Sequence, residues 1–154
     1  MLTGKKQIIK TYYCMKLNLA NITIWLLRIL AAIIMLQTLY FKFTAHPQSV
    51  KLFTELGMEP WGRIGVGTFE LIASILLLIP RTTYIGAALG LGLMSGAIYF
   101  HLTKLGIIFD GDAVLFTYAV IVFICCVILL IIYRKDLFIL LDNLIRKPSK
   151  NAIH

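Results

Sequence analysis

The sequence has few charged residues, and acidic residues are scarcest among them. Charged residues make up 14% of the 154 positions, and only seven Asp and Glu stand against fifteen Lys and Arg. Hydrophobic residues make up 60% of the chain, so a soluble fold would have too few polar groups to cover its own surface. These absences exclude a sizeable soluble domain and indicate a single helical membrane domain.

Cysteine is also scarce, and none of the three is in a CxxC pair (Cys14, Cys125, Cys126). We interpret the adjacent Cys125 and Cys126 as small packing residues of an apolar helix, which argues against a dithiol–disulfide exchange enzyme. The sequence lacks a glycine-rich phosphate loop, a nucleophile elbow and a haem-attachment motif. Its three histidines share no zinc-ligand spacing, so we predict no metal site.

Four long apolar runs fill most of the chain, and each approaches the roughly 20 residues that a helix needs to cross the hydrocarbon of a bilayer. The predicted fold is an all-α membrane protein, a four-helix transmembrane bundle over residues 22–133. Its predicted spans are residues 22–40, 61–79, 85–102 and 113–133.

The segments around the spans predict short helices that lie at the membrane surface. Residues 1–21 form a basic interfacial segment, which we expect to be retained because no A-x-A-like cleavage site follows the first apolar run. Pro47 and Gly57 can begin and end a helix in the first outer loop. In the basic tail, residues 134–154, apolar residues recur at helical spacing between Asp136 and Arg146, which predicts an amphipathic cytoplasmic helix.

The basic residues predict the orientation of the bundle. The N-terminal segment, the turn at Arg81 and the C-terminal tail hold ten of the fifteen, so the positive-inside rule places both termini in the cytoplasm. Because the positive charge collects at the ends of apolar runs, we expect membrane lipids as partners and no nucleic acid.

Glu70 lies well inside the second apolar run, where a carboxylate costs roughly 2.5–3.5 kcal/mol on insertion scales unless it faces protein or water. Lys42 and His101, near the outer ends of the first and third spans, are its candidate partners, and Ser74 shares its helical face. One interpretation is a polar clamp that fixes helix register. The other is a ligand-binding site formed by Lys42, Glu70, Ser74 and His101, where carboxylate and imidazole could bond a quinone head group and exchange its proton.

Two further polar residues of the first span are less informative. Gln37 falls on the side opposite the predicted bundle face, and Arg28 is interpreted as a residue that snorkels or bonds carbonyls at the cytoplasmic end. Glycines at GxxxG spacing predict close helix packing, within the chain or between copies in a homo-oligomer. The predicted packing residues are Gly67, Gly86, Gly90, Gly92 and Gly96.

Polar and helix-breaking landmarks occur in a fixed order from Phe41 to Gly106. They are Phe41-Lys42-Phe43, the segment 52–57 leading to Pro60-Trp61, Phe69-Glu70-Leu71, the segment 76–82, Gly86-Ala87, Gly96-Ala97-Ile98 and His101-Leu102. Together they resemble the DoxX family of small bacterial membrane proteins. The resemblance implies a four-helix protein of the bacterial inner membrane, with Lys42, Glu70, Arg81 and His101 at motif positions.

The resemblance also bounds the expected function. Some members of the DoxX family are subunits of thiosulfate:quinone oxidoreductases, and others are linked to redox-stress complexes. We therefore expect a non-catalytic or accessory subunit of a redox-linked membrane complex. The alternatives are a quinone-linked oxidoreductase component, with quinone as cofactor near Glu70, and a small-molecule or lipid-binding membrane protein.

Overall fold

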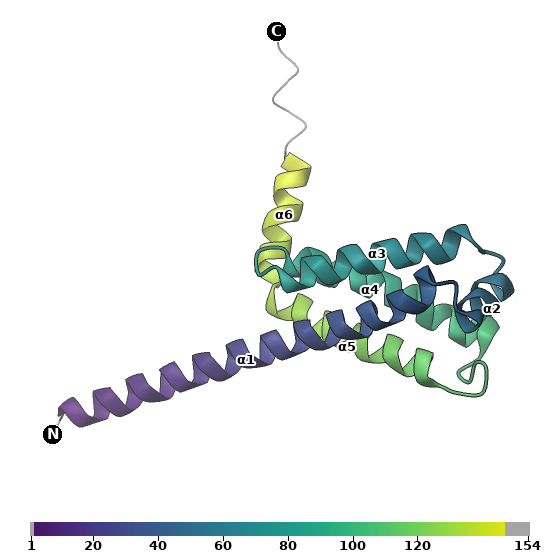
Figure 1. Cartoon of the computed structure of the whole chain (residues 1–154). Coiled ribbons are helices and arrows are strands. Elements are labelled where there is room, and N and C mark those ends of the chain that lie inside the picture. Colours follow the sequence, from purple (N-terminus) through teal and green to yellow (C-terminus); the bar gives the residue numbers. More distant parts are fainter. Residues whose placement is uncertain (1, 147–154) are drawn as a thin grey trace, which may run out of the picture.

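A computed structural model describes the backbone of residues 2–146 and the side chains of residues 19–142. The described chain is all-α (Figure 1). Its elements are α1 (Leu2–Phe43), α2 (Pro47–Glu55), α3 (Trp61–Leu78), α4 (Thr83–Phe100), the π-helical turn η1 (His101–Leu105), α5 (Val114–Ile132) and α6 (Arg134–Arg146).

Four of these helices are long and apolar enough to cross a membrane. The candidate spans are Leu19–Phe43, Trp61–Leu78, Thr83–Leu105 and Val114–Ile132. Large apolar side chains cover the outside of the bundle, where Leu26, Ile33 and Phe69 are all more than half exposed. An apolar outer surface suits a bilayer, because lipid tails solvate it as well as protein does. The chain is therefore a multi-pass membrane protein.

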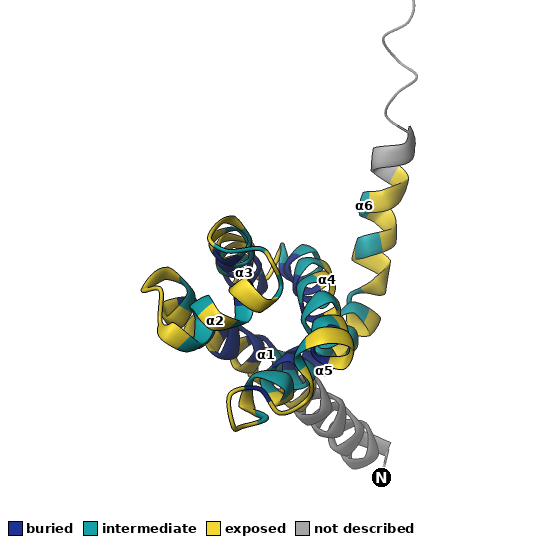
Figure 2. Cartoon of the chain, turned by 90° about the vertical axis from the view of Figure 1, so that its right-hand side faces the viewer, coloured by how far each residue is buried: buried dark blue, intermediate teal, exposed yellow. Residues whose placement is uncertain are grey.

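The four long helices form a ring. α1 packs against α3 and α5, and α4 packs against the same two helices from the other side. Figure 2 looks down the bundle from the end that carries α2 and shows the buried faces turned inward. The centre is filled by small and flexible side chains such as Ala31, Met35, Ala73 and Cys126. The bundle has two ends, which we call the α2 end and the terminal end, where α6 and the N-terminal half of α1 lie (Figure 1).

The first predicted span is longer than expected. We predicted a basic interfacial segment over residues 1–21, and α1 continues without a break through residues 2–21; the interfacial position of this segment stays a prediction. Residues 1–21 contain no proline and a single glycine, so the local sequence offers little to end the helix. The basic side chains of this segment, and residues 147–154 of the predicted tail, lie outside the described residues.

The short elements agree with their sequence signals. α2 begins with Pro47 as its first residue, and Gly57 beyond its end has a φ of 72°. Asp110 and Gly111, with φ values of 56° and 92°, make a tight turn closed by hydrogen bonds between Phe109 and Asp112. Asp112 then accepts a hydrogen bond from the backbone N–H of Val114 at the start of α5. α6 lies across the bundle axis (Figure 1).

The predicted glycine packing within the chain holds on one face of α4 and not on the other, where packing between copies stays a prediction. A Cβ on Gly86 would come within 2.6–2.9 Å of the backbone of α3, and one on Gly90 would lie 3.0 Å from the Sγ of Cys126. Gly67 faces the side chains of Lys42 and Phe43 at ordinary contact distance. Nothing lies within 4 Å of the Cβ positions of Gly92 and Gly96, because these two glycines face a cavity rather than a neighbouring helix.

Candidate functional site

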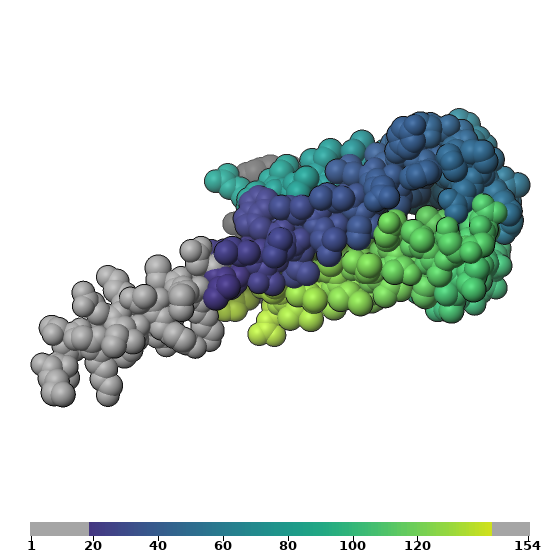
Figure 3. Space-filling model, turned by 60° about the horizontal axis from the view of Figure 1, so that its bottom comes forward, coloured from purple at the N-terminus to yellow at the C-terminus, as the bar shows by residue number. Residues whose placement is uncertain are grey.

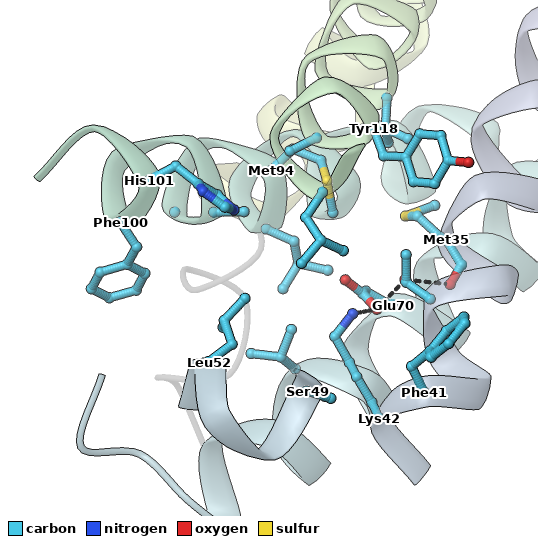
Figure 4. Close-up of a pocket in the computed structure, with 18 of the residues that line it drawn as sticks. Met35, Phe41, Lys42, Ser49, Leu52, Glu70, Met94, Phe100, His101 and Tyr118 are labelled. Carbon is cyan, nitrogen blue, oxygen red and sulfur yellow. Dashed lines mark hydrogen bonds and ion pairs between the residues drawn. The ribbon is translucent and has the colours of Figure 1, made fainter. Parts of the chain in front are cut away.

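A cavity of about 390 Å³ lies inside the α2 end of the bundle. Its volume is within the range of sites for small molecules. α1, α2, α4 and α5 all contribute to its walls, which are mostly apolar; they include Met35, Phe41, Leu52, Phe53, Leu93, Met94, Phe100, Leu115 and Val122. Figure 4 shows this arrangement, with side chains from several helices pointing toward a common space.

Glu70 supplies the acidic group of this cavity from the middle of α3. It is 4% exposed, and its Oε2 accepts hydrogen bonds from Lys42 Nζ at 2.8 Å and from Thr38 Oγ1 at 3.2 Å. Both donors come from α1, so the ion pair ties α1 to α3. The sequence predicted that Lys42 would reach Glu70, and the structure brings the two together.

The other carboxyl oxygen of Glu70 is available to a ligand. In the part of the chain that the structure describes, no hydrogen bond reaches Oε1, and no side-chain polar atom is both fully buried and without a partner. Oε1 therefore keeps some accessible surface although Glu70 is buried, and that surface faces the cavity that Glu70 lines. Figure 4 shows this oxygen directed into the open space.

His101 lines the same cavity from η1, at the far end from Glu70 (Figure 4). The side chain is 4% exposed. Its Nδ1 lies 2.9 Å from the carbonyl oxygen of Gly106, and its ring stands edge-on to Phe116 with centroids 5.7 Å apart. The structure therefore does not pair His101 with Glu70 directly, and the binding role predicted for His101 stays a prediction.

Ser74 is the fourth residue of the predicted set. Its hydroxyl donates to the backbone oxygen of Glu70 at 2.8 Å, one helical turn back along α3. The side chain is fully buried and is not among the residues that line the cavity. The structure thus places Ser74 beneath the site and not in it.

Two arginines join α1 and α3 outside the cavity by bonding the last carbonyl groups of each other's helix. Arg28 of α1 donates to the oxygens of Leu77 and Leu78 at the end of α3, both at 2.6 Å. Arg63 of α3 donates to the backbone oxygen of Lys42 near the end of α1 and pairs with Glu59 at 2.7 Å. Carbonyls in the last turn of a helix have no hydrogen-bond donor within that helix. The two arginines supply donors to these carbonyls, which lipid tails cannot do.

Two polar residues that flank the cavity were not predicted from the sequence. Gln37 of α1 was set aside as facing away from the bundle, yet it lines the cavity, and so does Tyr118 of α5. The error arose because α1 lies between α3 and α5, so two of its flanks contact protein and not one. A helical wheel for α1 alone could not show which neighbour occupies the second flank.

The cavity opens toward the side of the bundle. Gln37 and Phe41 of α1 are exposed and line it, and so does the exposed Val114 of α5. The space-filling view shows a gap in the surface between the dark blue residues at the end of α1 and the green residues of α5 (Figure 3). An opening between two spans is accessible to molecules dissolved in the bilayer.

An exposed ion pair closes the α2 end above the cavity. Lys51 Nζ of α2 lies 2.7 Å from Asp110 Oδ1 in the loop before α5. The hydrogen bond to Asp110 raises the pKa of Lys51 above its ordinary value, because the bond favours the charged ammonium. The pair links α2 to the loop that precedes α5.

Arg81, the remaining motif residue, lies far from this cavity. It is exposed in the turn between α3 and α4, at the terminal end, where it lines a separate hollow with Pro80, Tyr84 and Asp136. The structure therefore groups Lys42 and Glu70 together, places His101 across the cavity from them, and separates Arg81 from all three.

A comparison with protein families gives one match. The model of the DoxX-like family matches residues 26–129, which is more than half of the chain and includes α3, α4, most of α5, the second half of α1 and the residues that line the cavity. No curated protein and no solved structure gives a significant match.

Proposed function

The chain belongs to the DoxX-like family, and from this and from its cavity we propose that it binds a small lipophilic molecule with a polar head group, of the quinone class. It does so as a non-catalytic, accessory subunit of a redox-linked membrane complex. The proposed membrane is the bacterial inner membrane. Both termini lie in the cytoplasm and α2 lies at the outer face, in accord with the distribution of basic residues.

One observation carries the proposal: an apolar cavity contains a buried carboxylate with one unoccupied oxygen. The walls suit an aromatic ring or a hydrocarbon tail, since Phe53, Met94 and Phe100 line them. Glu70 supplies a polar contact that a purely apolar cavity would lack. Ligand sites combine apolar walls with a few such polar groups, which fix orientation.

The lateral opening supports the same ligand class. A molecule that partitions into the bilayer would reach the gap between α1 and α5 without crossing water (Figure 3). The polar head would then lie against Glu70, while the tail extends back toward the lipid. A strongly water-soluble ligand would gain nothing from an opening on this side.

Filling the cavity tests this function. Gly96→Leu places a side chain into the cavity, where a Cβ meets nothing within 4 Å. Gly65→Leu is the matched control, because its Cβ position on α3 is equally open but does not line the cavity. The test measures binding of a short-chain quinone to each purified protein in nanodiscs, together with the lipophilic molecules that solvent extracts from it.

We expect Gly96→Leu to weaken quinone binding at least tenfold and to deplete the extracted ligand, whereas Gly65→Leu behaves as the wild type. The expected loss follows from excluding the head group from its contacts, since 1.4 kcal/mol corresponds to about tenfold in affinity. Equal binding by all three proteins would contradict the proposed function.

A second candidate is a purely structural subunit in which Glu70 clamps the helices. The observation in its favour is that Lys42 and Thr38 of α1 both donate to one oxygen of Glu70, as a register clamp requires. Glu70→Gln separates the two functions. A variant that assembles normally but loses the ligand contradicts the clamp, and a variant that fails to assemble while the folded fraction binds normally supports it.

A further inference from the structure

Two polar atoms of buried residues face the cavity without a hydrogen-bond partner among the described residues, and they share one chemical property. Glu70 Oε1 belongs to a carboxylate paired with an ammonium, and an ionised carboxylate only accepts hydrogen bonds. Lys42 donates to Oε2, on the other side of the carboxyl group, so it leaves the acceptor character of Oε1 unchanged.

His101 presents a second acceptor. The carbonyl oxygen of Gly106 can only accept, so the 2.9 Å contact requires the proton of the ring on Nδ1. In a neutral imidazole the other nitrogen then carries a lone pair and accepts. No hydrogen bond to Nε2 occurs among the described residues, and the ring points into the cavity (Figure 4).

The remaining polar side chains around the cavity are less deeply buried than Glu70 and His101. Gln37 and Asp112 are exposed, and the half-buried ones are Thr38, Lys42, Gln48, Ser49 and Tyr118. Figure 4 shows the Tyr118 hydroxyl turned away from His101. The two buried polar residues of the cavity therefore both present an acceptor, and the donor beside them, Lys42, directs its ammonium to Glu70 Oε2.

We infer that the cavity selects a dihydroxy aromatic ligand, the reduced quinol, over the oxidised quinone of the same shape. This inference rests on the proposed function and specifies its ligand. A quinol can donate one hydroxyl to Oε1 and the opposite hydroxyl to Nε2. A quinone carries only acceptors, so it would leave both buried groups without partners, and unpaired buried groups are costly.

The inference predicts a redox-dependent affinity. We expect the quinol to bind about tenfold more tightly than the quinone for each hydrogen bond that it makes and the quinone cannot. Since binding the reduced form more tightly makes reduction easier, the midpoint potential of the bound ligand should rise, by about 30 mV for each tenfold preference in a two-electron couple.

The test uses the full-length protein in nanodiscs under anaerobic conditions. The probes are tetramethyl-p-benzoquinone, its quinol, and the dimethyl ether of that quinol, which keeps the ring but has no donor. Affinities are measured by calorimetry for the wild type, for Glu70→Gln, and for His101→Asn, in which the amide can keep the bond to Gly106 while the outer acceptor is removed.

Tighter binding of the quinol than of both other probes supports the inference. The preference should fall in His101→Asn, and it should fall further or reverse in Glu70→Gln, because an amide can donate to a quinone oxygen. Equal affinity for quinol and ether, or tighter binding of the quinone, would overturn the inference and leave the proposed function standing. Binding of none of the probes would overturn both.

Discussion

At the terminal end of the bundle the buried polar groups are occupied by protein partners, whereas at the α2 end two of them keep unused acceptors. The guanidinium of Arg28 donates to the carbonyls of Leu77 and Leu78, and the hydroxyl of Thr83 donates to the carbonyl of Ile79. Glu70 and His101 are as deeply buried but each leaves one atom facing the cavity. Burial alone does not separate the two ends, because Arg63 at the α2 end is also buried and bonds Lys42 and Glu59. The unused acceptors distinguish Glu70 and His101 from the other buried polar residues.

The glycines of α4 repeat the same contrast. Gly86, toward the terminal end, lets two helix backbones touch, while Gly92 and Gly96, toward the α2 end, leave open space. A GxxxG spacing allows close approach, but whether it produces contact or a cavity depends on what the neighbouring helix does. Here α2 and η1 cover the α2 end, so the space that larger side chains at Gly92 and Gly96 would fill stays open as part of the cavity.

The largest expected effect on stability comes from removing the hydrogen bonds of Arg28 at the terminal end. Arg28→Met removes the guanidinium donors from the carbonyls of Leu77 and Leu78. An unpaired group costs about 1–3 kcal/mol, so we expect the free energy of unfolding to fall by about 2–5 kcal/mol. Unfolding of the protein in detergent micelles measures this change. Arg134→Met, at an exposed arginine of α6, is the control, and an equal loss in both variants would contradict the role assigned to Arg28.

A smaller loss should follow from adding one methyl group at the close helix contact. In Gly86→Ala the new Cβ meets backbone atoms of α3 within 2.9 Å, and overpacking of this kind costs about 1–3 kcal/mol. The matched change Gly67→Ala meets only side chains at 3.5 Å or more and should be nearly neutral. Thermal unfolding of the two variants side by side checks the difference, and the reverse order would refute the packing described.

The smallest effect is expected at the exposed pair above the cavity. Because the pKa of Lys51 is raised in the folded protein, the pair stabilises the fold below the ordinary lysine value of 10.5 and is lost as the pH rises through the raised pKa. Because the pair is exposed, Lys51→Ala should lower stability only slightly at neutral pH. This small loss should shrink as the pH rises through the raised pKa, where the wild type loses the pair too, and a loss that grows in the alkaline range would contradict the role given to the pair.

The bundle was predictable from the sequence for a simple physical reason. A helix that crosses a bilayer must be about 20 residues long and apolar, so residues 61–79 and 113–133 agree within a residue or two with α3 and α5. The pairing of Glu70 with Lys42 was predictable too, because a carboxylate in an apolar run needs a cation within reach. Each of these inferences depends on one helix or on one pair.

The cavity was not predictable, because it depends on several helices at once. Gln37 lines it only because α5 lies beside α1, and the bond from His101 to Gly106 exists only because α4 ends in a π-helical turn followed by a glycine with a φ of 80°. A stretch such as residues 101–106 carries no marked sequence signal for that turn. The positive φ favours glycine there, and Gly106 was the one available hint.

Photochemical labelling tests the central claim, that the α2 end holds a lipophilic ligand against Glu70, most directly. The protein in nanodiscs is irradiated with an azidoquinone, digested and mapped by mass spectrometry, with and without excess unlabelled quinone. Labelling of cavity residues such as Leu93 and Met94, abolished by the competitor and by Gly96→Leu, is the predicted result. Labelling confined to outward-facing residues such as Phe69 and Ile75, insensitive to competitor, would contradict the claim.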